Sequence, residues 1–160
     1  MLAVDIATLD LPTLISLAGG AANEHLLERV QAAGHPKIRT SHGYVFQHLI
    51  AGSPTVGELA ERLGVTQQGA SKVVVELEAL GYVLREADPE DTRIRRVALT
   101  AKGRAVVERG RAARAKLEAE LLSEVSPKAM AAARKVLVAL LRRTGGLEAV
   151  TTRRVKIPSR

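Results

Sequence analysis

Apolar residues recur every three or four positions along most of the chain, and this spacing is typical of amphipathic helices. Asp10 is a residue type that caps helix N-termini, and the pattern after it predicts a first helix that continues to about Ala33. A second helix is predicted to start at Thr40 or Ser41 and to be closed by Gly52. The N-terminal third of the chain is therefore predicted to be helical.

Residues 55–83 contain two short apolar periodicities around one glycine, TVGELAERLGVTQQGASKVVVELEALGYV. Thr55 and Glu58 have the T-x-x-E spacing of a capping box, in which each side chain bonds the backbone N–H of the other residue. Gly64 can adopt a positive φ, which lets the chain turn sharply, and Thr66 then caps the next helix. Two short helices joined by a tight glycine turn predict a helix-turn-helix.

The pattern after Gly81 changes from helical to alternating. YVLREA and RRVALT each predict a short strand, and the polar segment DPEDTRI between them predicts the tip of a hairpin. Helical spacing then returns, with Thr100 as the cap of a long helix and Ser126 as the cap of a last one that runs to about Arg143. The predicted fold class is therefore mainly α with a small β-hairpin (α+β).

The second helix of the helix-turn-helix has a polar outer face. Its inward positions are apolar, whereas its outward positions carry two glutamines, a serine, a lysine and Val75. An ordinary helical hairpin in a core does not need such side chains, but a helix that enters the major groove of DNA uses them to bond base edges and phosphates. The residues of this helix that we expect to bind DNA are Thr66, Gln67, Gln68, Ser71 and Lys72.

The predicted hairpin is rich in arginine. A charged loop tip is most often a solvated surface feature, but this one directly follows a helix-turn-helix, as a wing beside a recognition helix does. An arginine at a wing tip can enter the minor groove of DNA, where the negative potential is strongest. The hairpin residues that we expect to contact DNA are Arg85, Arg93 and Arg95. Asp91 precedes Arg93 by two residues, and we expect it to hold that arginine in place.

Four segments of the chain fit one known pattern: ELAERLGV, TQQGASKVVVELEALGYV, DPEDTR and LTAKGR. The most specific part is the D-x-R of Asp91 and Arg93, followed by Leu99, Thr100 and Gly103. On these motifs, residues 40–122 resemble the MarR family of winged helix-turn-helix transcriptional regulators.

The resemblance implies a homodimer, built from N- and C-terminal helices, that binds a pseudo-palindromic site on double-stranded DNA and in most cases represses transcription. It divides the chain into an N-terminal dimerisation helix (1–38), a winged helix-turn-helix DNA-binding domain (39–100), C-terminal dimerisation helices (101–143) and a basic flexible tail (144–160). The terminal helices also carry more apolar residues than a small winged domain can bury, which independently favours a dimer.

The resemblance further implies a small effector, often aromatic or phenolic, that binds between the dimerisation helices and the winged domain. His25, His42 and Phe46 are the candidate lining residues, although packing or surface roles are more ordinary for each of them. His42 and His48 are six residues apart and do not share a helical face, so that we expect no metal site. No cofactor is expected.

The net charge of the 160-residue chain is +7 and its pI is about 10.2, which favours a polyanionic partner. The first 34 residues carry a net charge of −3 and the remainder +10, so that a polyanion should meet the middle or the C-terminal part. The chain has no cysteine, a poor signal-peptide pattern and no apolar run near the roughly 20 residues of a membrane span. We therefore expect a cytoplasmic protein without a membrane partner.

Two other classes of function remain as alternatives. An enzyme is not expected, because the sequence has no nucleophile elbow, phosphate-binding loop, HExxH or CxxC motif. A winged-helix protein-interaction module without DNA binding is the closer alternative. Acidic or apolar residues in place of Lys72 and Arg93 would have favoured that alternative, and the chain does not have them.

Overall fold

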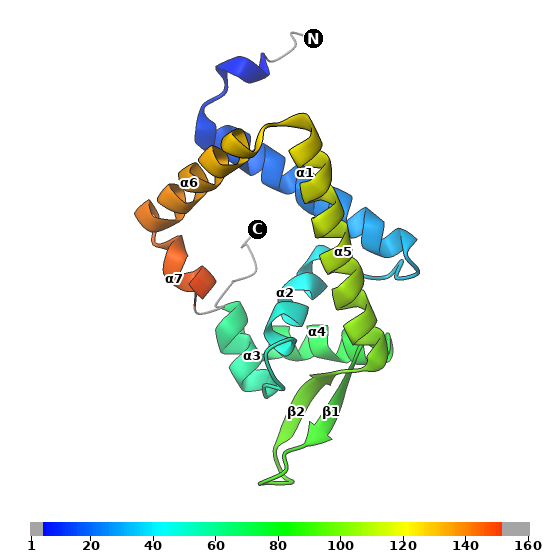
Figure 1. The fold of residues 1–160 in the computed structure, drawn as a ribbon. Helices are drawn as coiled ribbons and strands as arrows, with labels where there is room; N and C mark the ends of the chain where they lie inside the picture. The colour runs from blue at the N-terminus through cyan, green and yellow to red at the C-terminus, as the bar shows by residue number, and fades with distance from the viewer. Residues whose placement is uncertain (1–4, 152–160) are drawn as a thin grey trace.

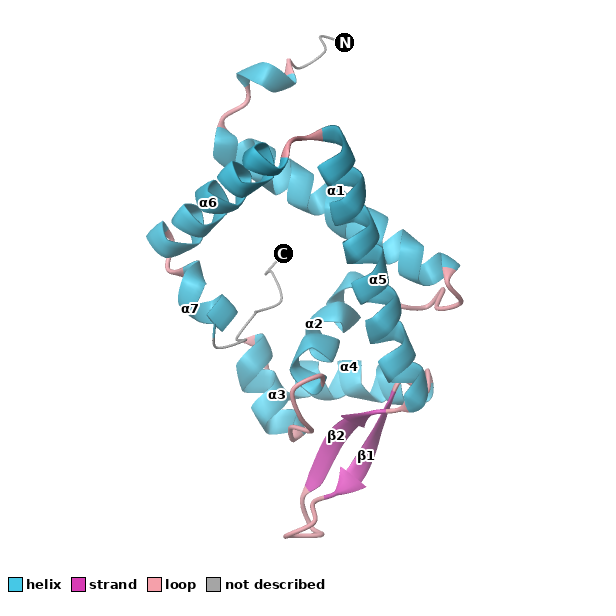
Figure 2. Ribbon diagram, in the orientation of Figure 1, coloured by secondary structure: helices cyan, strands magenta, loops and turns pink. Residues whose placement is uncertain are grey.

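The computed structural model describes residues 5–151, and these form a mainly helical fold with one β-hairpin (Figure 1). The elements in chain order are η1 (Ile6–Thr8), α1 (Leu11–Ala32), α2 (Thr40–Leu49), α3 (Val56–Leu63), α4 (Gln67–Ala79), β1 (Val83–Ala87), β2 (Arg95–Leu99), α5 (Ala101–Glu124), α6 (Pro127–Arg143) and α7 (Gly146–Thr151). The strands are antiparallel, and their hairpin projects away from the helices (Figure 2). The predicted α+β winged helix-turn-helix fold is confirmed.

The predicted helix caps are present at five of the helix starts. In each case a side-chain oxygen accepts a hydrogen bond from the backbone N–H three residues later, over 3.0 to 3.2 Å. These capping residues are Asp10, Thr55, Thr66, Thr100 and Ser126, and Glu58 completes the predicted capping box with Thr55. Such caps satisfy backbone donors that have no partner within the helix, and they fix where each helix begins.

The start of α2 differs from the prediction. Neither Thr40 nor Ser41 is the N-cap, because the cap position is occupied by Arg39 and the helix begins at Thr40. The ring Nδ1 of His42 accepts a hydrogen bond from the Arg39 backbone N–H over 3.3 Å. His42 therefore reaches back to the cap residue as the glutamate of a capping box does. The helix ends at Leu49 with Ile50 as its C-cap, so that Gly52, which was predicted to close it, lies two residues further on.

The hydrophobic core lies where α2, α3, α4 and the hairpin meet. Leu59 and Leu63 of α3, Val74 and Leu77 of α4, and Val97 of β2 are all fully buried there. Each of these residues faces inward at its helical or strand spacing, so that the outer faces of the same elements are left to solvent.

The hairpin is fixed to the start of α5 by a close backbone approach. A Cβ atom at Gly103 would lie 2.1 Å from the carbonyl oxygen of Tyr82, so that only glycine fits there. The hydroxyl of Thr100 donates to the carbonyl of Gly81 over 2.7 Å. These contacts set the direction in which the hairpin leaves the helical part.

The terminal helices are much less buried than the winged part. α1 packs along α5, yet Val30 is the single buried residue among the 22 residues of this helix. α6 has no buried residue among the described chain, and it stands away from the winged part in Figure 1. α7 occupies the start of the predicted flexible tail, and residues 152–160 lie outside the described range. Within residues 5–151, no helix is both long and apolar enough to cross a bilayer.

Candidate nucleic-acid interface

The turn between α3 and α4 has the geometry of a helix-turn-helix. Gly64 has a φ of 66°, and the N–H of Val65 returns to the carbonyl of Ala60 over 3.1 Å. Thr66 then caps α4 through the N–H of Gly69. Because Gly64 turns the chain and Thr66 already caps the next helix, three residues separate the end of α3 at Leu63 from the start of α4 at Gln67.

The outer face of α4 is open to solvent along its first two turns. Thr66, Gln67, Gln68 and Lys72 are exposed and Ser71 is half-buried, so that the rest of the described chain leaves these predicted DNA-binding residues accessible. Val75 is 52% exposed on the same face. Gln68, Ser71, Lys72 and Val75 are spaced i, i+3, i+4 and i+7, which is the spacing of base-contacting side chains on other recognition helices.

The tip of the hairpin presents an arginine held by a carboxylate. Arg93 donates to Asp91 from Nε over 3.0 Å and from Nη2 over 2.8 Å, in a two-pronged ion pair. The Arg93 guanidinium lowers the pKa of the Asp91 carboxyl, chiefly through these hydrogen bonds. The side chain of Arg93 is nevertheless 89% exposed. Asp91 therefore orients the arginine without covering it.

The loop at the tip of the hairpin is held where it leaves β1 by Asp88, which sequence analysis missed. Asp88 is buried and pairs with the guanidinium of Arg96, and its Oδ1 accepts from the backbone N–H of Glu90 over 2.8 Å. The hydrogen bond from Arg96 is the main reason why the pKa of Asp88 is lowered. Arg96 also reaches the carbonyl of Ser53 over 3.2 Å. An aspartate before a proline is a turn-forming signal that could have indicated this role.

The other two predicted hairpin arginines differ in their surroundings. Arg85 is half-buried, and its Nε lies 3.5 Å from Glu78 Oε2 of α4. Arg95 is exposed at the far end of β2, opposite Ala87 in the hairpin register. Arg95 is thus directly accessible to a DNA backbone, whereas Arg85 connects the hairpin to α4.

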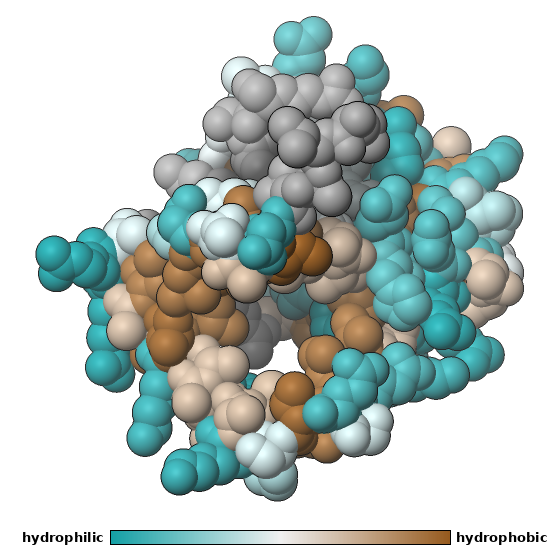
Figure 3. Space-filling model, turned by 90° about the horizontal axis from the view of Figure 1, so that it is seen from above, coloured by the Kyte–Doolittle hydropathy of each residue, from teal (hydrophilic) through white to brown (hydrophobic). Residues whose placement is uncertain are grey.

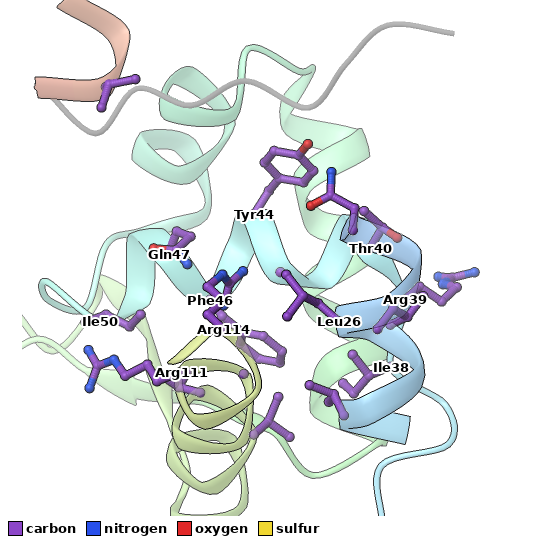
Figure 4. Close-up of a pocket in the computed structure, with 18 residues that line it drawn as sticks. Leu26, Ile38, Arg39, Thr40, Tyr44, Phe46, Gln47, Ile50, Arg111 and Arg114 are labelled. Atoms are coloured by element: carbon purple, nitrogen blue, oxygen red, sulfur yellow. The ribbon is translucent and has the colours of Figure 1, made fainter. Parts of the chain in front are cut away.

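A cavity of about 700 Å³ lies between α1, α2 and α5 (Figure 4). Its apolar lining includes Leu26, Leu27, Val30, Ile38, Phe46, Ile50, Val106 and Val107. Of the three predicted pocket residues, Phe46 lines this cavity. His25 lines a second hollow of about 200 Å³ between α1 and α5, and His42 is fully buried outside both linings. The structure therefore does not bring the three predicted residues into one pocket.

The polar lining of the larger cavity has one sign of charge. It contains the guanidinium-bearing residues Arg39, Arg111 and Arg114 and several neutral polar residues, and none of its lining residues is acidic. Figure 4 shows Arg111 and Arg114 on the α5 side and Arg39 on the opposite side. Because an apolar wall with arginines at its edge suits a ligand that has both an apolar body and a negative charge, the lining indicates an amphipathic anion.

The described residues offer little for metal chemistry. No group of three or more His, Asp or Glu side chains within residues 5–151 is placed to hold a metal ion. The polar groups of the interface are instead donors and acceptors on a helix face and a hairpin tip, which together define a winged helix-turn-helix.

Comparison with known proteins agrees with this class. The model of the MarR family matches residues 40–94, which include α2, the helix-turn-helix and the arginine at the hairpin tip. Residues 40–94 therefore match the MarR family, a family of DNA-binding transcription regulators, and the chain has the winged helix-turn-helix fold. No curated protein has significant sequence similarity to the chain.

Solved structures of MarR-type proteins have the same fold. MepR, a transcription regulator of the Staphylococcus aureus multidrug efflux pump MepA, is 19% identical, with a TM-score of 0.69 over 85% of this chain and 99% of that chain. YusO from Bacillus subtilis is 22% identical, with a TM-score of 0.62 over 84% of this chain and 99% of its own. A mutant of S. aureus MepR bound to an oligodeoxyribonucleotide is 20% identical, with a TM-score of 0.62 over 85% and 99%.

Proposed function

We propose that this protein represses transcription by binding, as a homodimer, to a pseudo-palindromic operator near a promoter, and that it acts as a regulator rather than as an enzyme. The observation that carries the proposal is the exposed, uncharged-to-basic outer face of α4 beside a hairpin whose tip presents an arginine. A helix of about 10 Å diameter with such a face fits the major groove, while the hairpin reaches the adjacent minor groove.

In this proposal α4 reads bases. Gln68 can bond adenine through a donor and an acceptor, and Lys72 can bond guanine or a phosphate. Gln67 and Ser71 contact bases or phosphates, and Thr66 fixes the helix start beside the phosphate backbone. The free N–H groups of the first turn of α4 add a partial positive charge towards that backbone.

The hairpin, or wing, supplies the second contact. Arg93 enters the minor groove with its guanidinium oriented by Asp91, and Arg95 contacts the sugar–phosphate backbone. We give Arg85 a supporting role, because its pairing with Glu78 connects the wing to the recognition helix. A relative, the mutant MepR, has been solved with an oligodeoxyribonucleotide, which supports DNA as the partner here.

A second copy of the chain is the proposed partner of α6. This helix has no buried residue in the described chain, although Val136, Leu137 and Val138 are apolar and 38% to 43% exposed. In Figure 3 apolar side chains gather on the side where α6 and α7 lie in Figure 1. Two copies joined through such helices would place two recognition helices about 34 Å apart, one turn of DNA. Light scattering at micromolar concentration should therefore give the mass of a dimer.

We further propose that the larger cavity binds a small aromatic or phenolic effector that releases the operator. The apolar walls between α1, α2 and α5 suit an aromatic ring, and S. aureus MepR has been solved with ethidium bromide bound. The cavity lies between the helices proposed to form the dimer and the winged part, so that an occupant contacts both.

A gel-shift experiment with the DNA upstream of the protein's own gene tests the proposal. We expect a specific complex that weakens steeply as salt rises, since counterion release supplies much of the affinity. A variant with Lys72→Glu should lose the complex while keeping its fold by circular dichroism. A protein-interaction module without DNA binding would give no shift with any duplex, including one selected from a random pool.

A further inference from the structure

We propose that Arg39 couples the cavity to the recognition helix: an organic anion in the cavity draws the Arg39 guanidinium away from Glu76 and thereby weakens DNA binding. This inference rests on the proposed function, in which α4 reads DNA and the cavity binds an effector. The inference adds two points to the proposed function: the ligand is negatively charged, and Arg39, His42 and Glu76 transmit the effect of its binding to α4.

Arg39 belongs to both sites at once. It lines the cavity, and its Nη2 donates to Oε2 of Glu76 in the C-terminal half of α4. In Figure 4 the Arg39 side chain runs along the edge of the cavity, with its guanidinium directed away from the centre. The pair is partly open to solvent, with side chains 59% and 36% exposed, so that competing anions can reach it.

His42 holds the same carboxylate from the first turn of α2. Its Nδ1 accepts from the Arg39 backbone N–H over 3.3 Å, which leaves the ring proton on Nε2 in the neutral form. Nε2 lies 3.5 Å from Oε1 of Glu76. The ring is fully buried, and this burial lowers the pKa of His42, which favours the neutral form. Arg39 and His42 are therefore positioning residues, and both act on DNA through Glu76.

Glu76 is well placed to affect DNA reading. It follows Lys72 by one helical turn and is adjacent to Val75, so that it lies at the side of the proposed reading face. The element pairs with the most α4 contacts are α3 with α4 and β1 with α4, and Val74 and Leu77 bury its inward face in the core. The bonds from Arg39 and His42 to Glu76 hold a further side of α4, and we expect their loss to let α4 tilt in the groove.

The cavity has the charge to compete for Arg39. Arg111 and Arg114 line it from α5, and no acidic residue does so. Arg111 already pairs with Glu108 over 2.6 Å, whereas Arg114 has no carboxylate within ion-pair distance in residues 5–151. Arg114 is therefore available to hold a ligand carboxylate in the cavity, and we expect the negative charge of that ligand to compete with Glu76 for the Arg39 guanidinium. A neutral ligand of the same shape has no charge with which to compete against Glu76.

Thermodynamic reciprocity supplies the test. If the anion and the operator compete through Glu76, each lowers the affinity of the protein for the other by the same factor. We would measure operator affinity by fluorescence anisotropy, with and without 1-naphthoate, and naphthoate affinity by calorimetry on both DNA-free and operator-saturated protein. 1-Naphthamide is the neutral probe of the same shape. We expect naphthoate to weaken operator binding by about tenfold and naphthamide to change it by less than about twofold.

Two variants separate coupling from mere packing. Glu76→Gln removes the competitor for Arg39, so that naphthoate should bind several-fold more tightly while operator affinity stops responding to it. Arg39→Gln removes the shared residue, so that naphthoate should bind more weakly and the response should also disappear. Opposite changes in naphthoate affinity cannot arise from a general loss of structure. Glu78→Gln is the matched control, because Glu78 is on the same helix but pairs with Arg85; its response should equal that of the wild type.

The outcomes distinguish this inference from the proposed function. If Glu76→Gln binds naphthoate no more tightly than the wild type, or if its operator affinity still responds, the coupling through Arg39 is wrong. An equal effect of naphthamide would show that shape rather than charge acts. If the wild type binds no operator at all, the proposed function fails. The naphthoate affinities of Glu76→Gln and Arg39→Gln, measured by calorimetry, would still show whether Glu76 and the ligand compete for Arg39.

Discussion

The winged part and α6 are built on opposite principles. In α3 and α4 most of the inward apolar side chains are buried within the same chain, and Leu59, Leu63 and Leu77 have no exposed surface. In α6 the apolar residues Val136, Leu137 and Val138 are exposed, and the helix has no buried residue in the described chain. One region is therefore stabilised by its own core, whereas the other exposes apolar surface that water disfavours, and this difference identifies where a partner is needed.

The largest expected effect comes from the core of the winged part. Leu77→Ala should lower the free energy of unfolding by about 2–5 kcal/mol, because the side chain is fully buried and the cavity left behind cannot be filled. Urea denaturation followed by circular dichroism measures this change. Leu137→Ala on α6 is the matched control, and a loss of the same size in protein dissociated by dilution would mean that α6 has a core of its own.

The second effect tests what covers α6. Leu137 is 43% exposed, and Leu137→Asp should weaken self-association by at least about 2 kcal/mol if this residue lies at the centre of the dimer contact. Sedimentation velocity across a concentration series would then detect monomer where the wild type is dimeric. Helical content should remain, since nothing in the described chain packs on this side chain enough to bury it. An unchanged association constant would move the interface away from α6.

Sequence patterns predict well those features that depend on near neighbours. The cap at Thr66 and the turn at Gly64 follow from conformational preferences within a few residues, and the structure has both. The polar face of α4 follows from helical periodicity. These local features are enough to place the reading face and the hairpin, which are the main parts of the candidate site.

The features that the sequence did not reveal depend on residues far apart in the chain. The cap role of Arg39 requires His42, whose ring orientation is set together with Glu76 on another helix. The cavity exists because α1 and α5 pack beside α2, so that Phe46 and Arg114 line the same space although they are 68 positions apart in the sequence. Periodicity reports that a face is apolar or polar, but it does not say which distant face lies opposite.

A third prediction compares the two arginines of the wing. Arg93→Ala should weaken operator binding by about tenfold, because a guanidinium in the narrow minor groove is lost. Arg85→Ala should have a smaller effect, since its guanidinium pairs with Glu78 and does not stand free. Anisotropy titrations at one fixed salt concentration give both values. Equal losses would mean that the wing acts through its general charge rather than through its tip.

The fourth prediction concerns pH and separates the same two regions. Burial lowers the pKa of both His35 and His42 below the ordinary value of 6.5, and nearby Lys102 and Arg109 add to the effect on His35. Because the unfolded chain then binds more protons than the folded one, stability is complete above pH 6.5 and is lost as the pH falls below it. Each histidine contributes at most ~1.4 kcal/mol per pH unit in that window.

Thermal unfolding of the wild type and of His42→Gln between pH 7.5 and 5 measures this dependence. The variant should lose part of the slope, whereas Leu137→Asp on α6 should keep it, since both histidines lie in the winged part or against it. A slope unchanged by His42→Gln would assign the acid sensitivity to other groups.

The smallest expected effect concerns Val75, an apolar side chain that is exposed among polar neighbours. It is 52% exposed on the reading face, one turn beyond Ser71, where an apolar contact with the methyl group of thymine is possible in the major groove. Replacing the contacted thymine by uracil removes only that methyl group, and we expect operator binding to weaken by ~0.8 kcal/mol, the value of one buried CH₂ group.

A scan of single thymine-to-uracil replacements in the operator locates the contacted position. Val75→Ser should abolish the difference between the two bases at that position and leave the others unchanged, because the contact and its partner are removed together. If no thymine in the operator responds, Val75 faces solvent in the complex, and the polar residues of α4 alone read the sequence.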